Sequence, residues 1–426
     1  MENVLLIHYK EEIEMQVMYK RCCGIDVHKM KIVCCLKKGN KQEFREFSAE
    51  TKELIKIAKW LKESKCEMIA MESTGSFWKP LWNVFEDEDL NQMLCNAKDM
   101  KNVPGKKTDI KDSEWICDLL QHGLLKASYI PDREQRELRE LIKYRKSMTE
   151  ERARELNRLQ KMLEGANIKV VSKFSKLENK TCRGLIDYIL KLEEDENIKE
   201  EEVRKIIQVN VKSGLDEIMV AMEGIITPIQ KELMKSVIEH INDMAERIEK
   251  LNKMVEKYME KYEKNIKKLE KIPGIGKTSA QVILAEIGQD MQQFPTAGHL
   301  ASWAGVCPGN NESAGKRRSG KTRKGNQVLK STLVQCANSS KRHRNSFYYA
   351  QYQRIMIHRG KKRATVAVAH SMLISIYYML KYDKEYNELG SQFYNQFNTE
   401  KKIKSYIKKL HELGVDVLMD TSLTKA

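Results

Sequence analysis

The sequence predicts an α/β domain followed by helical regions, an α/β plus α fold class. Three observations support this prediction. Short β-branched and apolar runs alternate with helical periodicity over residues 21–127, two long charged helical stretches follow, and short helices with Gly/Pro turns begin at Lys271. With 426 residues, the chain is too long for one compact core. The expected divisions are an N-terminal extension (1–20), the α/β domain (21–128), a long-helix, coiled-coil region (129–270), a mainly helical C-terminal domain (271–381) and a polar helical tail (382–426).

The α/β domain is predicted to begin with three strands. Apolar residues fill 22–36 on both sides of a turn-like Asp26-Val27-His28-Lys29, and 43–47 alternates as the third strand after a Gly39-Asn40 hairpin turn. The pattern then predicts, in order, a helix at 51–62, a buried strand at 68–71, a helix containing Trp78, a strand at 92–97 and a helix at 108–122. Three strands followed by alternating helix and strand is the order of an RNase H-like domain.

Two long helices are predicted next, at 132–165 and 229–270. In the second, apolar residues step by three and four from Ile241 to Tyr262, and Asn265 continues the register, which is typical of a coiled-coil seam. The seam could join two copies of the chain, or it could pack on the earlier helix as a hairpin within one chain. The residues between the two helices are predicted to be helical and polar, without residues that carry chemistry.

Positive charge is concentrated in one segment. The chain has 76 Lys+Arg and 60 Asp+Glu, a net charge of +16. Residues 308–363 contain 15 Lys+Arg and a single acid, Glu312, so this basic block accounts for +14. Such density indicates a polyanionic partner, most often nucleic acid. The alternative is a solvated basic surface.

Cysteine spacing and hydropathy exclude several other classes. None of the ten cysteines forms a CxxC pair, which argues against a zinc ribbon or a thioredoxin-like motif, and a reduced cytosolic interior fits them best. The first twenty residues lack the apolar run of a signal peptide. Residues 364–380 are barely long enough to span a membrane and contain His370, so a buried helix is the better interpretation. We expect a cytoplasmic protein that does not contact a membrane.

Four acids lie where a metal-dependent nuclease site would need them. Asp26 is on the first strand, Glu72 closes the buried strand, and Asp109 and Asp112, three residues apart, point from one face of a helix. Mg²⁺ takes carboxylate and phosphate oxygens as ligands, and two such ions about 4 Å apart can stabilise both oxygens of a phosphoryl transfer. Each acid alone could be a surface carboxylate, and Asp109 could cap its helix.

The glycine-rich turn from Pro273 to Lys277 is not a nucleotide-binding loop. A Walker A motif would need glycine at Lys271 and a preceding strand, so an ATPase is excluded. A helix-hairpin-helix fits better, because Gly274 and Gly276 allow a tight turn and the next helix would direct N–H groups and Lys277 towards a DNA phosphate. A plain turn between two helices is the alternative.

Ser313 lies in a Gly/Asn-rich segment that we expect to be a flexible loop. A small hydroxyl beside cations could attack a phosphate if a base or metal activates it, although serine in such a segment is ordinarily a turn residue. Ser302 and Ser319 are rival serines. Tyrosines 348, 349 and 352 offer a tyrosine nucleophile, but their spacing fits helix packing equally well. The expected nucleic-acid contacts are Gly274, Gly276, Lys277, Lys316, Arg317, Arg318, Lys321, Arg323 and Lys324.

These motifs resemble those of one family. The segments 24–29, 72–75 and 107–112 resemble the acidic motifs of the DEDD transposases of bacterial insertion sequences. The segments 273–276, 301–305 and 312–316 resemble motifs of their C-terminal domain. The resemblance covers roughly residues 21–381, and relatives include DNA invertases and RNA-guided bridge recombinases.

The resemblance implies a fold, a site and partners. It implies a RuvC-like (Holliday-junction-resolvase-like) N-terminal domain in which Asp26, Glu72, Asp109 and Asp112 hold Mg²⁺, with Mn²⁺ as a possible substitute. It implies that Ser313 attacks the scissile phosphate and forms a covalent phosphoserine link to DNA. Here Glu312 and Ala314 replace a serine and a glycine found in many members, which removes a rival serine.

The resemblance also implies a bacterial, nucleoid-associated homo-oligomer, a dimer or tetramer, in which acids of one subunit and the serine of another form the site. It further implies a structured guide RNA encoded by the element. Two alternatives stay open: a metal-dependent, structure-specific nuclease without a covalent intermediate, and a non-catalytic nucleic-acid-binding scaffold.

Overall fold

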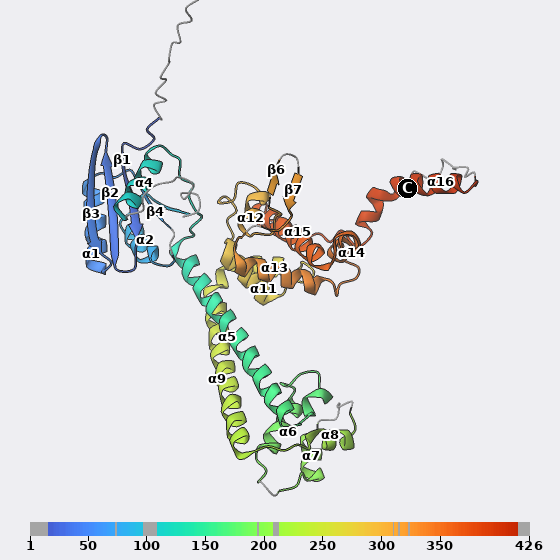
Figure 1. Ribbon diagram of the computed structural model, residues 1–426. Helices are drawn as coiled ribbons and strands as arrows, with labels where there is room; N and C mark the ends of the chain where they lie inside the picture. Colours follow the sequence, from blue (N-terminus) through green and yellow to red (C-terminus); the bar gives the residue numbers. More distant parts are fainter. Residues whose placement is uncertain are drawn as a thin grey trace, which may run out of the picture. The chain divides into compact units, whose positions relative to one another are not determined.

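The computed structural model describes residues 16–72, 75–96, 109–193, 196–207, 213–309, 311–313, 316–322 and 324–415. For residues 109–110, 311–313, 316–319, 394–402 and 404 this description covers the backbone only. The chain divides into two compact units, Met1–Arg133 and Glu134–Ala426 (Figure 1).

The first unit is built on a five-stranded sheet with the strand order β3-β2-β1-β4-β5. The first three strands form an antiparallel meander, and β4 and β5 continue the sheet parallel to β1. The strands are β1 (Arg21–Val27), β2 (Lys31–Lys38), β3 (Lys41–Ser48), β4 (Met68–Glu72) and β5 (Gln92–Cys95). The predicted mixed α/β class is confirmed, and the order of elements is consistent with an RNase H-like domain.

Helices cover both faces of this sheet. On one face, α1 (Thr51–Glu63) and α2 (Trp78–Asp87) enclose a core that includes Ile25 and Met71. On the other face, α4 (Asp109–Gln121) packs on a smaller core that includes Cys22 and Ala70. Side chains alternate along β1 and β4 because successive strand residues point to opposite faces. This alternation decides which face each acid occupies.

A long helical hairpin begins the second unit. The helices α5 (Arg133–Gly165) and α9 (Pro228–Tyr258) run side by side, and the seam of α9 is buried against α5 through Met148, Met244 and Leu251 (Figure 1). The structure therefore supports the intramolecular alternative for the seam. The single helix predicted over 229–270 is interrupted: η2 (Glu260–Tyr262) and α10 (Glu263–Glu270) follow α9, and the Asn265 side chain donates a hydrogen bond to Gln289.

The segment between α5 and α9 is more than a polar connection. Its elements are η1 (Val170–Lys173), α6 (Lys180–Ile189), α7 (Glu200–Ile206) and α8 (Leu215–Met222). Together with the adjoining ends of α5 and α9 they enclose a core that includes Leu159, Leu185, Ile218 and Ile241. The predicted helices are present, but the segment is not only polar, because apolar residues that are dispersed among charged ones in sequence meet when the helices pack.

The rest of the second unit is a helical domain that carries one small hairpin. Its elements are α11 (Lys277–Ile287), α12 (Ala297–Trp303), β6 (Asn311–Ser313), β7 (Lys316–Ser319), α13 (Gln327–Ser340), α14 (Phe347–Arg359), α15 (Lys361–Lys381) and α16 (Phe393–Glu412). Among the described helices, α15 alone is long and apolar enough to cross a membrane by length and composition. Val368, Leu373 and Ile376 of α15 are buried within the protein, as a core helix requires.

Candidate functional site

Two of the predicted acids lie at the ends of neighbouring parallel strands. The register pairs Ile25 of β1 with Met71 of β4, so Asp26 and Glu72 are the next residues on their strands. Ile25 and Met71 face the core beneath α1 and α2. Asp26 and Glu72 therefore lie on the opposite face, which α4 covers.

Helix α4 brings a third acid to this face. A Cβ atom at Gly24 would overlap the backbone carbonyl oxygen of Ser113 and the backbone nitrogen of Cys117, so α4 lies directly on the β1 backbone at this glycine. Ser113 is fully buried by this contact, and Asp112 is the residue before it. Close packing at Gly24, two residues before Asp26, thus fixes the turn of α4 that carries Asp112.

The ionisation of Asp26 reflects this arrangement. Only 7% of Asp26 is exposed. Burial raises the pKa of Asp26 above its ordinary value, His28 opposes this effect, and the neighbouring carboxylates of Asp112 and Glu72 raise it further. The opposing contact is a hydrogen bond of 3.0 Å between His28 Nε2 and Asp26 Oδ2. His28 is not among the predicted site residues, although its place two residues after Asp26 beyond a strand end could have suggested a role.

Like-charged groups that converge in a buried setting fit a cation. Asp112 and Glu72 both act on the ionisation of Asp26, and carboxylate oxygens are the ligands that Mg²⁺ prefers. In the described part of the chain, no trio of His, Cys, Asp or Glu is already close enough to hold one ion. The backbone of Asp109 begins α4, and its side chain lies outside the description. The carboxyl groups of Asp26, Glu72 and Asp112 are of the kind that a divalent cation takes as ligands, and they lie on one face of the sheet.

Ser313 ends the first strand of a β-hairpin. The expectation of a flexible loop was therefore wrong for the strand residues 311–313 and 316–319. β6 and β7 are antiparallel, and Ser313 pairs with Lys316. At the base of the hairpin, the Gly309 N–H donates to the carbonyl oxygen of Lys321 (2.9 Å), and Pro308 bridges to Thr322. Lys321 and Lys324 are exposed. Arg323 and the side chains of Ser313, Lys316, Arg317 and Arg318 lie outside the described residues.

The glycine turn before α11 has one packed glycine and one open one. Gly274 has φ +97°, and a Cβ there would overlap the backbone of Cys336 in α13, so only glycine fits. Gly276, the N-cap of α11, has open space around it. The Lys277 ammonium lies 2.6 Å from Glu256, an exposed pair that partly neutralises this expected DNA contact.

Two family models match the chain over these regions. A DEDD transposase model of the IS110 type matches residues 23–168, and the model of the transposase IS116/IS110/IS902 family matches residues 266–353. The chain belongs to the DEDD transposases of insertion sequences. It is therefore a DNA transposase/recombinase, and DNA is its partner. Members of the DEDD family typically use divalent metal ions. No curated protein matches the chain.

In this transposase, two of the rival tyrosines serve as packing residues. Tyr348 and Tyr352 are buried. The Tyr348 hydroxyl donates to Ser375 (2.9 Å), and the Lys341 ammonium lies 4.1 Å from the ring centroid of Tyr352. These contacts favour the packing alternative for both residues. The rival Ser302 is exposed on α12.

A buried polar network anchors the segment that follows the hairpin. Glu286 of α11 is 1% exposed, lies 3.4 Å from Arg139 Nε, and accepts a hydrogen bond from the Asn326 side chain (2.6 Å). The Asn326 N–H donates to the carbonyl oxygen of Trp303. In the first turns of α5, Gln135 and Arg139 also donate to the carbonyl oxygen of Ala285. The start of α5 is thus built into the C-terminal domain.

A second group of cations lies at the junction of α14 and α15. Arg359, Lys361, Lys362 and Arg363 are exposed, and no described residue forms an ion pair with them. The first turn of α15 contains no acid. These residues belong to the basic block but were missing from the expected contacts, although the run Lys-Lys-Arg after a glycine was visible in the sequence.

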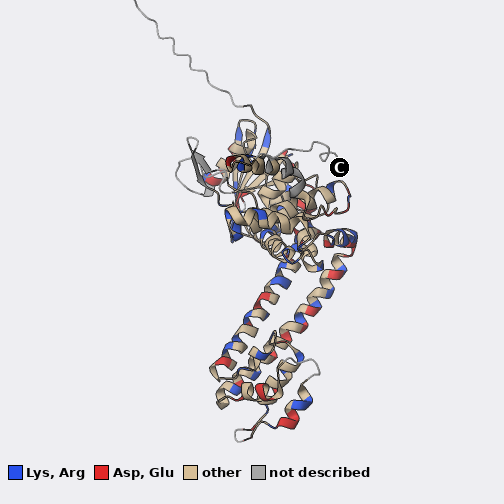
Figure 2. Ribbon diagram, turned by 90° about the vertical axis from the view of Figure 1, so that its right-hand side faces the viewer, with Lys and Arg blue, Asp and Glu red and all other residues tan. Residues whose placement is uncertain are grey.

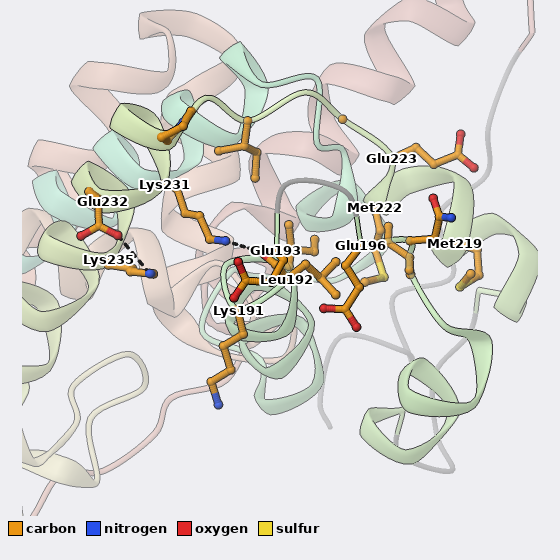
Figure 3. A pocket seen from close by; sticks show the side chains of 16 residues that line it. Lys191, Leu192, Glu193, Glu196, Met219, Met222, Glu223, Lys231, Glu232 and Lys235 are labelled. Atoms are coloured by element: carbon orange, nitrogen blue, oxygen red, sulfur yellow. Dashed lines mark hydrogen bonds and ion pairs between the residues drawn. The ribbon is translucent and has the colours of Figure 1, made fainter.

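The second unit contains a cavity lined by residues between 189 and 235, outside both the predicted acids and the basic block. It has a volume of about 1220 Å³ and lies among α6, α8 and α9 (Figure 3). Its lining mixes Lys and Glu, and two of its lysines are engaged: Lys231 donates to the Leu192 carbonyl oxygen, and Lys235 pairs with Glu232 (3.0 Å). Lys, Arg, Asp and Glu are likewise intermixed along α5 and α9 (Figure 2). Neither surface has the single sign of charge that a polyanion site requires.

Proposed function

We propose that this transposase cuts and rejoins DNA through a metal-binding acid cluster on a RuvC-like domain and a serine nucleophile, Ser313. The observation that carries the proposal is the convergence of Asp26, Glu72 and Asp112 at one end of the sheet. Asp109, at the start of α4, completes the proposed set. The strand order and the parallel β1–β4 pair support the RuvC-like assignment.

The acids would hold Mg²⁺, with Mn²⁺ as a possible substitute. A bound divalent ion would supply electrostatic stabilisation of the charge that develops on the phosphate oxygens. The protein's own contribution is position: β1 and β4 fix Asp26 and Glu72, and packing at Gly24 fixes Asp112. His28 orients the Asp26 carboxylate through its hydrogen bond.

The proposed chemistry conserves the number of phosphodiester bonds. The Ser313 oxygen loses its proton and bonds to the scissile phosphorus, while the bond from phosphorus to one deoxyribose oxygen breaks and that oxygen takes up a proton. A hydroxyl of the incoming strand then attacks the phosphoserine, which releases Ser313 and restores a DNA phosphodiester. No external energy source is needed, because each bond broken is replaced by an equivalent one.

The basic block would bind nucleic-acid backbone. Lys321 and Lys324 follow the hairpin strands, and Arg359, Lys361 and Arg363 surround the start of α15. Cations at a helix N-terminus are unfavourable by about 0.3–1 kcal/mol each, so a phosphate there would relieve this repulsion. The exposed N-terminus of α11 at Gly276 adds backbone N–H groups that suit the same ligand.

We further propose a homo-oligomer and a structured guide RNA, both of which rest on the family resemblance. Phosphates of RNA and DNA would suit the exposed cations equally. Light scattering of the purified protein measures the subunit number, and sequencing of co-purified RNA identifies any bound transcript. A protein that is monomeric and free of RNA when active would overturn both parts.

Ser313→Ala tests the nucleophile. Purified protein is incubated with Mg²⁺ and DNA that carries the ends of the element, and covalent protein–DNA adducts are separated on a denaturing gel. We expect Ser313→Ala to abolish adducts and recombination while DNA binding persists, and Ser319→Ala, in the same hairpin, to retain all three. An adduct that survives in Ser313→Ala would refute the serine assignment. Cleavage without any adduct in the wild type would favour the hydrolytic nuclease instead.

A further inference from the structure

A small cavity lies at the end of the sheet that carries the acid cluster, on the opposite face. It has a volume of about 210 Å³ and lies between the β1–β2 turn and the start of α2. Its apolar residues Ile32, Leu54 and Leu81 belong to the core beneath α1 and α2. Its polar lining comes from His28, Lys29 and Ser76.

This cavity and the acid cluster share a residue. Val27 and His28 follow Asp26 directly at the end of β1, and both line the cavity. The same His28 contacts the Asp26 carboxylate at 3.0 Å. His28 therefore joins the two sites: it lines the cavity and contacts Asp26 of the acid cluster.

The chemistry of the lining suits a planar aromatic group with an anionic attachment. Phe77 lines the cavity and is 41% exposed, so part of its ring is available to stack on a planar group. Lys29 is an exposed cation, and the lining contains no acid. The volume is below the roughly 300–1,000 Å³ of pockets for drug-sized ligands, which favours a single ring system over a larger molecule.

We propose that this cavity accepts one unpaired nucleobase of the DNA strand held at the acid cluster, with Phe77 as the stacking surface and Lys29 near the adjoining phosphate. The proposal rests on the proposed function, which places a DNA phosphate at Asp26. The base must leave its duplex partner to enter, as in other enzymes that extrude a nucleotide next to their chemistry. Stacking tolerates any base, because every base has a π-face.

The test uses the full-length protein and a single-stranded oligodeoxynucleotide that contains 2-aminopurine, with Ca²⁺ in place of Mg²⁺. We expect the wild type to quench the 2-aminopurine fluorescence on binding. Phe77→Ala should lose the quench and weaken binding about 5- to 150-fold, the effect of removing one base–aromatic stack, whereas Phe77→Trp should retain both. The matched control is Phe44→Ala, because Phe44 is also an exposed aromatic (40%) but lies on the edge strand β3. It should leave both unchanged.

The outcomes separate this proposal from the function on which it rests. Equal effects of Phe77→Ala and Phe44→Ala, or no effect of either, would overturn the base site. A change in self-association with unchanged DNA binding would assign the cavity to a protein partner and also overturn it. If Phe77→Ala binds normally while wild-type protein forms the Ser313 adduct, only the base site is wrong. Circular dichroism melting of each variant verifies that the fold persists.

Discussion

The end of the sheet that carries Asp26 and the hairpin that carries Ser313 are held by different means. Asp26 is buried, and its neighbours are fixed by the β1–β4 register and by backbone contact at Gly24. The hairpin is a two-stranded ribbon whose hydrogen bonds run between its own strands, and such a ribbon alone is marginally stable in water. The fold therefore holds Asp26, Glu72 and Asp112 on one face of the sheet, whereas the hairpin backbone is held mainly by the pairing of its own two strands.

The largest effect on activity should come from a change in the acid cluster. Asp26→Asn should lower recombination by at least about 10²–10³-fold, the scale of losing a key electrostatic group, and should remove the response to Mg²⁺. The measurement is recombination of a plasmid-borne element against Mg²⁺ concentration. Asp87→Asn, which alters an exposed carboxylate of the same unit, is the control and should change activity little. Activity that persists in the presence of a chelator would refute the metal site.

The same variant should become more stable as it loses activity. Because the pKa of Asp26 is raised in the folded protein, folding favours the protonated carboxyl. The stability that protonation gives is present below the ordinary carboxyl value and is lost as pH rises through the raised one. An asparagine side chain does not ionise, so the melting temperature of Asp26→Asn should exceed that of the wild type at neutral pH, with a gap that closes at low pH. A gap independent of pH would show that ionisation of Asp26 is not the cause.

A smaller effect is expected from Gly24→Ala. The added methyl group overlaps the α4 backbone, so the helix must move, at a cost of about 1–3 kcal/mol of unfolding free energy. Because that movement carries Asp112, activity should fall more than stability alone explains. Thermal melting and recombination are measured in parallel. Gly165→Ala, where an added Cβ meets open space, should change neither. Full activity in Gly24→Ala would show that the position of α4 is not critical.

The smallest effect should come from changes in the basic block, and it should appear in DNA affinity. Replacing Lys361, Lys362 and Arg363 with alanine should reduce the slope of log affinity against log salt by about 0.9 for each duplex phosphate that the protein no longer neutralises. DNA binding at several salt concentrations measures this slope. The control is the Lys191→Ala/Lys235→Ala double variant, which removes charges from the mixed lining of the large cavity. An unchanged slope in the triple variant would exclude α15 from the interface.

Local patterns predicted much of the α/β unit, including the strands at whose ends Asp26 and Glu72 lie. Alternation and apolar runs identified the strands, and acids at the ends of parallel strands meet at one edge. The partner of the α9 seam was not decided by its periodicity, which is the same whether α5 or a second copy covers it. The contact at Gly24 was missed because it joins residues about 90 positions apart in sequence. The hairpin around Ser313 was missed because Gly, Asn and Ser are typical of loops and turns alike.

The network at the start of α5 has a consequence for synthesis of the chain. The buried Gln135 side chain donates a hydrogen bond to the carbonyl oxygen of Ala285, which lies 150 residues later in the sequence. At about 5–20 residues per second, α5 would leave the ribosome roughly 8–30 s before α11 exists. Before α11 is made, the core between α5 and α9 can form, whereas the side chains of Gln135 and Arg139 stay exposed to solvent. The C-terminal domain therefore folds last, against a hairpin of α5 and α9 that has already formed. In a nascent chain arrested before α11, the start of α5 should be exposed, with the side chains of Gln135 and Arg139 lacking their carbonyl partners.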